Sequence, residues 1–427
     1  MLTIYGGKQR FCDGISRRNF LQIGALTLGG LTLPGLLRAS AQAGEKGSSH
    51  KSIIMVYLPG GPSHMDTYDL KPNAPAEYRG EFKAISGNVP GMDFCELFPR
   101  QAANADKLTI VRSVIGAVSE HAPALLMSGY GESVGKAQGG RPGLGAILSK
   151  LKGATDPRIP PYVSLMGNGT GLDSGYAGVA HRPFTPDGPG LDNLALNASV
   201  SLNRLGDRKT LLSDFDRFRN EADRTGVMSG MDSFAARAFE MITAPKTRNA
   251  LDLTREDPRT RDRYGSATQF LTARRLVEAG VRCVTLSVGS WDTHGNNFGH
   301  LRNQLPVVDQ AIAALVEDLH ARGMDRDCSV VVWGEFGRTP RINSGAGRDH
   351  WEPVMSALIA GGGLKMGQVI GSTNANGEVA KDRPVSVQQI LATLYHGLGV
   401  DPATTLNSAS GRPMYLLDER TPISEMI

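Results

Sequence analysis

The chain has 427 residues, of which 40% are hydrophobic and 21% charged, and its 46 Lys and Arg against 42 Asp and Glu give a formal net charge of +4 at pH 7. This length can bury a large core and allows one large domain or two ordinary ones. Residues 1–43 hold five of the basic residues and one of the acidic ones, so residues 44–427 carry 41 of each. That balance gives no support to a nucleic-acid partner. Three of the four cysteines lie beyond residue 43 without a CxxC spacing, which argues against a disulfide framework, an iron–sulfur site or a zinc ribbon.

Residues 1–43 have the pattern of a twin-arginine export signal. The sequence SRRNFL at residues 16–21 precedes an apolar stretch that ends near residue 37, and AQA at residues 41–43 forms an A-x-A cleavage site. Glycines and a proline interrupt the short apolar stretch, so we expect no stable membrane span. We therefore predict a periplasmic or secreted protein that uses the twin-arginine export machinery.

Apolar runs alternate with segments of helical spacing along residues 44–427. The expected strands are, in chain order, 52–58, 108–114, 161–166, 281–288, 328–333 and 354–360, and the expected helices are 142–152, 209–242, 266–279, 301–321 and 387–398. A loop-rich insert near 167–207 is rich in Gly, Asn, Asp and Pro. Strands that alternate with helices in this way predict an α/β fold with a mostly parallel central sheet and helices on both faces.

Three of these apolar runs end in glycine-rich loops that carry acidic residues or histidines. Ligands of open α/β sheets bind beyond the carboxyl ends of the strands, so these side chains are expected to face one crevice. Carboxylate oxygen and imidazole nitrogen are the ligands that divalent metals take in such sites. For each residue alone, a hydrogen bond within its loop is the simpler interpretation, and Asp66 or Asp292 could cap a turn or a helix. As a group, the predicted metal ligands are His64, Asp66, Asp292, His294, Glu335 and His350.

Four motifs, GGPSHMDTYDLKP, SVGSWDTHGNNF, GEFGRTP and GRDHW, stand in this order behind the leader. Together they resemble domain-of-unknown-function family 1501, and the resemblance covers essentially all of residues 44–427. That family is placed in the alkaline phosphatase-like superfamily with sulfatases, phosphodiesterases and cofactor-independent phosphoglycerate mutases. The resemblance implies one alkaline phosphatase/sulfatase-like domain over 44–427 and a divalent metal, which could be zinc, calcium or manganese.

The same resemblance places Ser119 at the position of the sulfatase nucleophile. Residues 119–129 match the gap between that nucleophile and the superfamily's L-[LT]-x-G sequence. His121 and Pro123 stand where sulfatases carry the proline and arginine of their pattern, so the resemblance does not imply conversion to formylglycine. A hydroxyl nucleophile fits phosphoryl transfer better.

Two further residues are candidate catalytic groups. His121 could be a general acid, a metal ligand or a packing residue. Arg338 has the fork geometry that clamps the non-bridging oxygens of phosphate or sulfate, and an ion pair with Glu335 or Asp349 is the equal alternative.

The sequence also departs from the superfamily's metal pattern. The spacing of Asp292 and His294 is two residues shorter than the superfamily's Asp-x-x-x-His pair, which makes His300 a competing ligand. Phe336 follows Glu335 where the superfamily has a histidine, and Gly60 or Gly61 stands where it has an aspartate after the first strand.

These features predict a metal-dependent hydrolase of phosphate or sulfate esters, acting on a small molecule or a polysaccharide. The alternative is a binding protein that keeps the fold and has lost turnover, which the missing histidine and aspartate favour. An exported redox enzyme is a third interpretation, but the sequence has no CxxC, haem or dinucleotide motif to support it.

Overall fold

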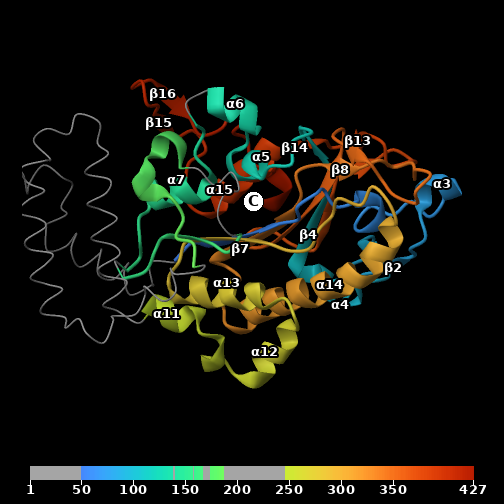
Figure 1. Ribbon diagram of the computed structural model, residues 1–427, viewed down its shortest axis with the longest axis horizontal. Helices are drawn as coiled ribbons and strands as arrows, with labels where there is room; N and C mark the ends of the chain where they lie inside the picture. Colours follow the sequence, from blue (N-terminus) through green and yellow to red (C-terminus); the bar gives the residue numbers. More distant parts are fainter. Residues whose placement is uncertain (1–49, 138–139, 157, 167–173, 187–245) are drawn as a thin grey trace, which may run out of the picture. The chain divides into compact units, whose positions relative to one another are not determined.

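A computed structural model describes residues 50–137, 140–156, 158–166, 174–186 and 246–427 (Figure 1). The predicted export leader, the expected helix at 209–242 and most of the expected insert at 167–207 lie outside the described residues. Two short 3-10 helices, η3 (Gly175–Ala177) and η4 (Val179–His181), lie in the described part of that insert.

An eight-stranded sheet forms the centre of residues 51–427 (Figure 1). Its order is β11-β4-β10-β7-β1-β6-β5, with β14 also paired to β4. β10 is antiparallel to both of its neighbours, and every other pairing in the sheet is parallel. The strands are β1 (Ser52–Tyr57), β4 (Leu108–Ile115), β5 (Tyr162–Ser164), β6 (Cys283–Ser287), β7 (Cys328–Trp333), β10 (Met355–Gly361), β11 (Gln368–Ile370) and β14 (Val385–Ser386).

Alternate residues of β1 belong to two separate hydrophobic cores, one on each face of the sheet. Ile54 and Val56 lie in the core that includes α4 (Pro99–Ala103), α13 (Thr268–Ala279) and α14 (Asn297–Ala321). Ile53 and Met55 lie in the core of α5 (Ala124–Ser128), α7 (Leu144–Leu151) and α15 (Val387–Gly397). Figure 1 shows these two groups of helices on opposite sides of the sheet. The predicted α/β class with a mostly parallel sheet and helices on both faces is therefore confirmed. A strand covered on both faces needs apolar side chains in both directions, which is why β1 is an unbroken apolar run.

Local sequence signals set several helix ends. Ser386 and Gln389 form a capping box at the start of α15, with each side chain accepting from the other residue's backbone N–H. Gly280, with φ of 119°, ends α13 in the left-handed conformation that favours glycine. Among the described residues, no helix combines the length and the apolar character that a membrane crossing requires.

Shorter elements surround the sheet. They comprise the helices α3 (Ala76–Arg79), α6 (Glu132–Ala137), α11 (Lys246–Leu251) and α12 (Pro258–Tyr264), and the strand pairs β2 (Ala84–Ser86) with β3 (Asp93–Cys95), β8 (Gly337–Arg338) with β9 (His350–Trp351), β12 (Ser372–Thr373) with β13 (Ala380–Asp382), and β15 (Thr405–Asn407) with β16 (Pro413–Tyr415). The β8–β9 pair bears on function, because it places Arg338 opposite His350.

Candidate metal centre

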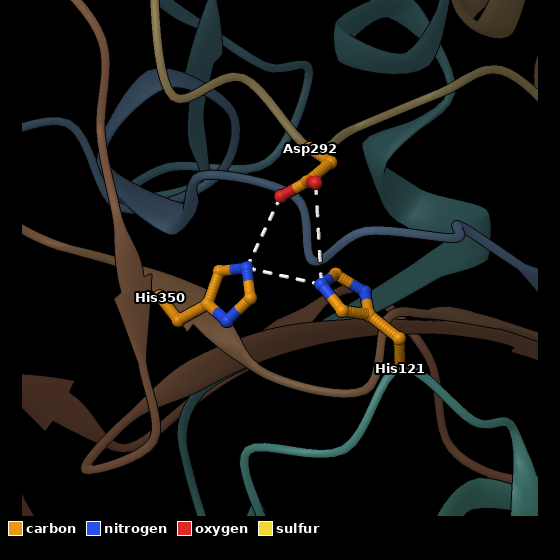
Figure 2. A group of neighbouring side chains, drawn as sticks. All are labelled: His121, Asp292 and His350. Carbon is orange, nitrogen blue, oxygen red and sulfur yellow. Dashed lines mark hydrogen bonds and ion pairs between the residues drawn. The ribbon is translucent and has the colours of Figure 1, made fainter.

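The loops that follow β4, β6 and β7 meet at one edge of the sheet. These strands run in the same direction, so their carboxyl ends lie at the same edge. His121 follows β4, Asp292 follows β6, and His350 lies in β9 beyond the β7 loop. Figure 2 shows these three side chains pointing toward one another from separate segments. One ligand atom from each lies within 4.8 Å of the others, so the group could hold a metal ion.

A single ring nitrogen, Nε2 of His350, is the point on which this cluster converges. It lies 3.1 Å from His121 Nε2, 3.1 Å from His294 Nε2 and 3.1 Å from Asp292 Oδ1. His294 Nε2 is also 3.0 Å from the same Asp292 oxygen. An imidazole nitrogen carries either one proton or one lone pair, so it can satisfy only one of three such neighbours by a hydrogen bond. His121, Asp292 and His350 form a group that could hold a shared cation, and His294 lies beside that group.

Carboxylates hold the far nitrogens of two of these imidazoles. Asp349 Oδ1 is 2.7 Å from His294 Nδ1, and Glu335 Oε1 is 3.3 Å from His121 Nδ1. Because a carboxylate accepts, Nδ1 is the donor in both contacts. A neutral imidazole that donates from Nδ1 has its lone pair on Nε2, the nitrogen that faces the cluster. This carboxylate–histidine arrangement is the usual support of histidine metal ligands. Glu335 is fully buried and also accepts from the Gly60 backbone N–H at 2.8 Å, which fixes its position.

The spacing of the ligand atoms fits a small divalent ion. Bonds of about 2.0–2.1 Å in a tetrahedral zinc site imply about 3.4 Å between neighbouring ligands. The three 3.1 Å separations from His350 Nε2 fall within a few tenths of an ångström of that value, and the His121 Nε2–Asp292 Oδ2 separation is longer, at 4.0 Å. The His350 side chain is 23% exposed and the His121, His294 and Asp292 side chains are 42–48% exposed, so the cluster opens to solvent on one side. Catalytic metal sites keep such an open position for substrate.

Asp292 is held ionised by a buried arginine. Burial opposes ionisation, but hydrogen bonds from Arg338 and His350 outweigh it and lower the pKa of Asp292 to about 2. Arg338 is fully buried, and its other donors go to the carbonyls of Gly60, Gly61 and Arg348. Of the alternatives open for Arg338, the structure gives an ion pair, but with Asp292 rather than with Glu335 or Asp349. The guanidinium is thus committed to positioning Asp292.

Glycine is required where the β1 loop approaches Asp292. Gly60 has φ of 99°, and a Cβ there would lie 2.4 Å from the backbone nitrogen of Asp292. Gly61 has φ of 74°, and its Cβ would lie 2.5 Å from the ring of Phe336. The glycines of the GGPSHMD motif therefore allow the β1 loop to approach the loops that carry Asp292 and Phe336.

His64 and Asp66, two of the six predicted ligands, are held away from this cluster in η1 (His64–Asp66). Both oxygens of the buried Asp66 carboxylate accept from the buried Arg348 guanidinium, at 2.7 and 3.1 Å, and Asn297 donates to one of them. Nε2 of the buried His64 lies 2.8 Å from the carbonyl of Gly377, and burial lowers the pKa of the imidazole. These contacts engage both oxygens of Asp66 and one nitrogen of His64, and neither residue is part of the group that could hold a metal.

Ser119 is exposed in the loop between β4 and α5, two residues before His121. His300, the competing ligand for the shortened spacing, is exposed in the first turn of α14 and is not part of the metal-ligand group.

Two neighbours of the cluster were not predicted from the sequence in the roles that they have. Asp349 enters the sequence analysis only as a possible ion-pair partner of Arg338, and in the structure its carboxylate contacts His294. Phe336, which follows Glu335 in the GEFGRTP motif, packs against His350 with ring centroids 4.4 Å apart. The Asp-His pair in GRDHW is the signal in the sequence for an acidic neighbour, although it cannot say which imidazole the aspartate meets.

Comparison with known proteins gives one family and several distant structures. The model of a family described as "Protein of unknown function (DUF1501)" matches residues 50–427. No curated protein matches the sequence. The crystal structure of the PsFucS1 sulfatase from Pseudoalteromonas sp. is 12% identical and matches 85% of this chain and 70% of its own, with a TM-score of 0.37. The crystal structure of Ps i-CgsB is 12% identical and matches 82% and 72%, with a TM-score of 0.33, and the same protein has a structure in complex with k-i-k-neocarrahexaose.

Proposed function

The chain belongs to the DUF1501 family, and we propose that it is a divalent-metal-dependent hydrolase of phosphate or sulfate esters. One observation carries the proposal. His350 Nε2 lies 3.1 Å from a ring nitrogen of His121, a ring nitrogen of His294 and an oxygen of Asp292, and His121, Asp292 and His350 form a group that could hold a metal ion at the carboxyl edge of a mostly parallel sheet. The open side of this cluster leaves room for an ester group.

The donor set favours zinc among the metals considered. His121, His294 and His350 supply nitrogen and Asp292 supplies oxygen, and zinc and manganese accept such mixed sets. Calcium takes six to eight oxygen ligands, which these residues do not offer. A divalent ion bound there would polarise the ester oxygens and favour ionisation of a nearby hydroxyl.

The residues around the cluster have two proposed roles, as nucleophile and as positioning residues. Ser119 is the proposed nucleophile, because its exposed hydroxyl lies in the same loop as His121. Its oxygen would attack phosphorus or sulfur, the alcohol would leave with the serine proton, and water would then release phosphate or sulfate and restore the hydroxyl. Arg338, Asp349 and Glu335 act as positioning residues, because each holds a ligand side chain in place.

A binding protein without turnover is the second candidate function. Phe336 fills the position of a superfamily histidine and packs on His350. Within the described residues one group of side chains meets the geometry of a metal site. A single ion suits ligand binding as well as catalysis, so the two functions differ in whether product is released.

Export through the twin-arginine pathway to the periplasm or the medium completes the proposal and rests on residues 1–43. The substrate would be a small-molecule or polysaccharide ester outside the cytoplasm.

The decisive experiment is metal analysis by mass spectrometry on washed, folded protein. We expect near-stoichiometric zinc or manganese in the wild type and in His300→Ala, a matched histidine outside the cluster, and loss of metal in His350→Ala. Folded wild-type protein without metal would overturn the proposal. Assays with p-nitrophenyl phosphate and p-nitrophenyl sulfate then separate the two functions. Product release that Ser119→Ala abolishes while metal is retained supports the hydrolase, and metal binding without any product release supports the binding protein.

A further inference from the structure

A pocket of about 430 Å³ lies beside the metal centre. This volume is within the range of about 300–1,000 Å³ that small-molecule sites occupy. The side chains that define its chemistry come from α3, from the loop after β8, from β9 and from the turn before β13, and they are Tyr78, Arg341, Asn343, Asp349, Trp351 and Glu378. None of these residues has a role in the proposed chemistry except Asp349.

The pocket and the metal centre share Asp349. Its carboxylate lines the pocket and also accepts from His294 Nδ1 at 2.7 Å. Asp349 and Trp351 flank His350 in the chain, and successive side chains along a strand point to opposite faces. His350 therefore faces the metal centre while its two neighbours face the pocket. A ligand that reaches both must extend beyond a single small ring.

The walls of the pocket are held in place by hydrogen bonds. Arg348 donates to the carbonyl of Tyr78 at 2.8 Å and to that of Thr339 at 3.0 Å, which joins two sides of the pocket. Asn343 donates to both oxygens of Asp349, and its own side-chain oxygen accepts from the backbone of the same loop. A pocket held in this way is formed before its ligand arrives, which reduces the entropy lost on binding.

The lining combines two aromatic rings with uncommitted polar groups. Trp351 and Tyr78 are partly exposed, and the indole is fixed because its N–H donates to the carbonyl of Glu378 at 2.8 Å. The Arg341 side chain is exposed and makes no ion pair with another described residue. The Glu378 carboxylate accepts from Asn374 on one oxygen, which leaves the other for a ligand. Fixed aromatic faces suit the C–H face of a sugar ring, and carboxylate and guanidinium groups suit its hydroxyls and any anionic substituent.

We propose that this pocket binds a sugar ring, and that the substrate is an oligosaccharide or polysaccharide ester. The ring in the pocket neighbours the unit whose ester group lies at the metal centre. The assignment of the ester rests on the proposed function, whereas the binding of a sugar rests on the pocket alone.

Tryptophan fluorescence gives a direct readout of the pocket. The chain has three tryptophans, and Trp291 and Trp333 are buried at 2% and 0% exposure, so Trp351 is the one that a ligand in the pocket can contact. The experiment screens the full chain against an array of neutral, sulfated and phosphorylated oligosaccharides. The glycans that bind are titrated by fluorescence with the wild type, and by isothermal titration calorimetry with the wild type and every variant, because the Trp351 variants lack the fluorescent reporter. We expect a fluorescence change on binding, about tenfold or more weaker binding by Trp351→Ala, and near wild-type binding by Trp351→Phe, which keeps an aromatic face. Tyr415→Ala, at a tyrosine that is 48% exposed and outside the pocket, is the matched control.

Two results would overturn the inference: no binding to any glycan on the array, or equal binding by the wild type and Trp351→Ala. Repeating the titration after treatment with EDTA separates this inference from the proposed function. Glycan binding by a protein that holds no metal and hydrolyses no ester leaves the sugar pocket standing and refutes the hydrolase. Ester hydrolysis without glycan binding supports the hydrolase, refutes the sugar pocket and points to a small-molecule substrate.

Discussion

The buried ion pair between Asp66 and Arg348 allows a direct test of whether Asp66 is structural or a metal ligand. Both side chains are fully buried, and the pair is bidentate, with Nε–Oδ2 at 2.7 Å and Nη2–Oδ1 at 3.1 Å. In Asp66→Asn, one side of the amide presents N–H donors to the donors of the guanidinium. The substitution therefore leaves a buried cation without its counter-charge.

The expected cost follows from the contacts of Arg348. At 2.7 Å and an effective dielectric constant of about 20, the attraction between the charges is about 6 kcal/mol, which is an upper bound. Removing one partner of a buried pair costs about 3–5 kcal/mol, because the remaining charge stays desolvated. Arg348 cannot move to solvent without breaking its bonds to the carbonyls of Tyr78 and Thr339. We therefore expect Asp66→Asn to lose about 3–5 kcal/mol of unfolding free energy.

Urea unfolding at pH 7, followed by circular dichroism, measures this loss. The matched control is Glu81→Gln, which breaks an ion pair with Arg302 of similar length, 2.8 Å, whose side chains are 51–52% exposed. That exposed pair is worth about 1 kcal/mol or less. The measurement is repeated after EDTA treatment. If the Asp66–Arg348 pair is structural, Asp66→Asn loses the same unfolding free energy with and without EDTA. A loss no larger than that of the control, or a stable Asp66→Asn variant that has lost its metal, would refute the structural role of Asp66.

Three further predictions concern the support of the metal centre and the acid stability of the chain. Asp349→Ala removes the acceptor behind a ligand histidine, so metal affinity measured against a competing chelator should fall about 10–100-fold; unchanged affinity would contradict the role of Asp349. Gly60→Ala places a Cβ 2.4 Å from the backbone nitrogen of Asp292 and should lower both the metal content and the unfolding free energy. The control, Gly116→Ala, has φ of 88° and no atom within 4 Å of the added Cβ, so it should lose only about 1 kcal/mol of unfolding free energy and keep its metal. A hydrogen bond from Arg383 lowers the pKa of Glu425 from 4.5 to about 2, so its stabilisation is present above pH 4.5 and is lost as the pH falls through 2. The Glu425 side chain is 36% exposed, so Glu425→Gln should lose about 1 kcal/mol or less of unfolding free energy at pH 6, measured by urea unfolding. The difference in unfolding free energy from the wild type should narrow toward pH 3, and a difference that does not change with pH would argue against the ion pair.

The sheet could be predicted from the sequence because its signals are local. β1 and β7 are mostly apolar and each is followed within three residues by glycine, and burial on both faces of a parallel sheet favours that pattern. The position of functional groups after these strands follows from the same rule, because parallel strands bring their carboxyl ends to one edge. Asp292, His294 and His350 do lie together at that edge.

The sequence by itself determined the α/β class, the edge of the sheet at which the polar loops gather, and the leader pattern of residues 1–43, since each depends on residue types within short windows. Only the tertiary structure decided which carboxylate meets which partner. Asp66 and Asp292 follow strands in similar glycine-rich loops, yet the first pairs with Arg348, 282 positions away, and the second lies among histidines. Such pairings depend on how distant loops pack in three dimensions, and the low polarity of the interior makes each buried charge take the partner that the fold brings to it.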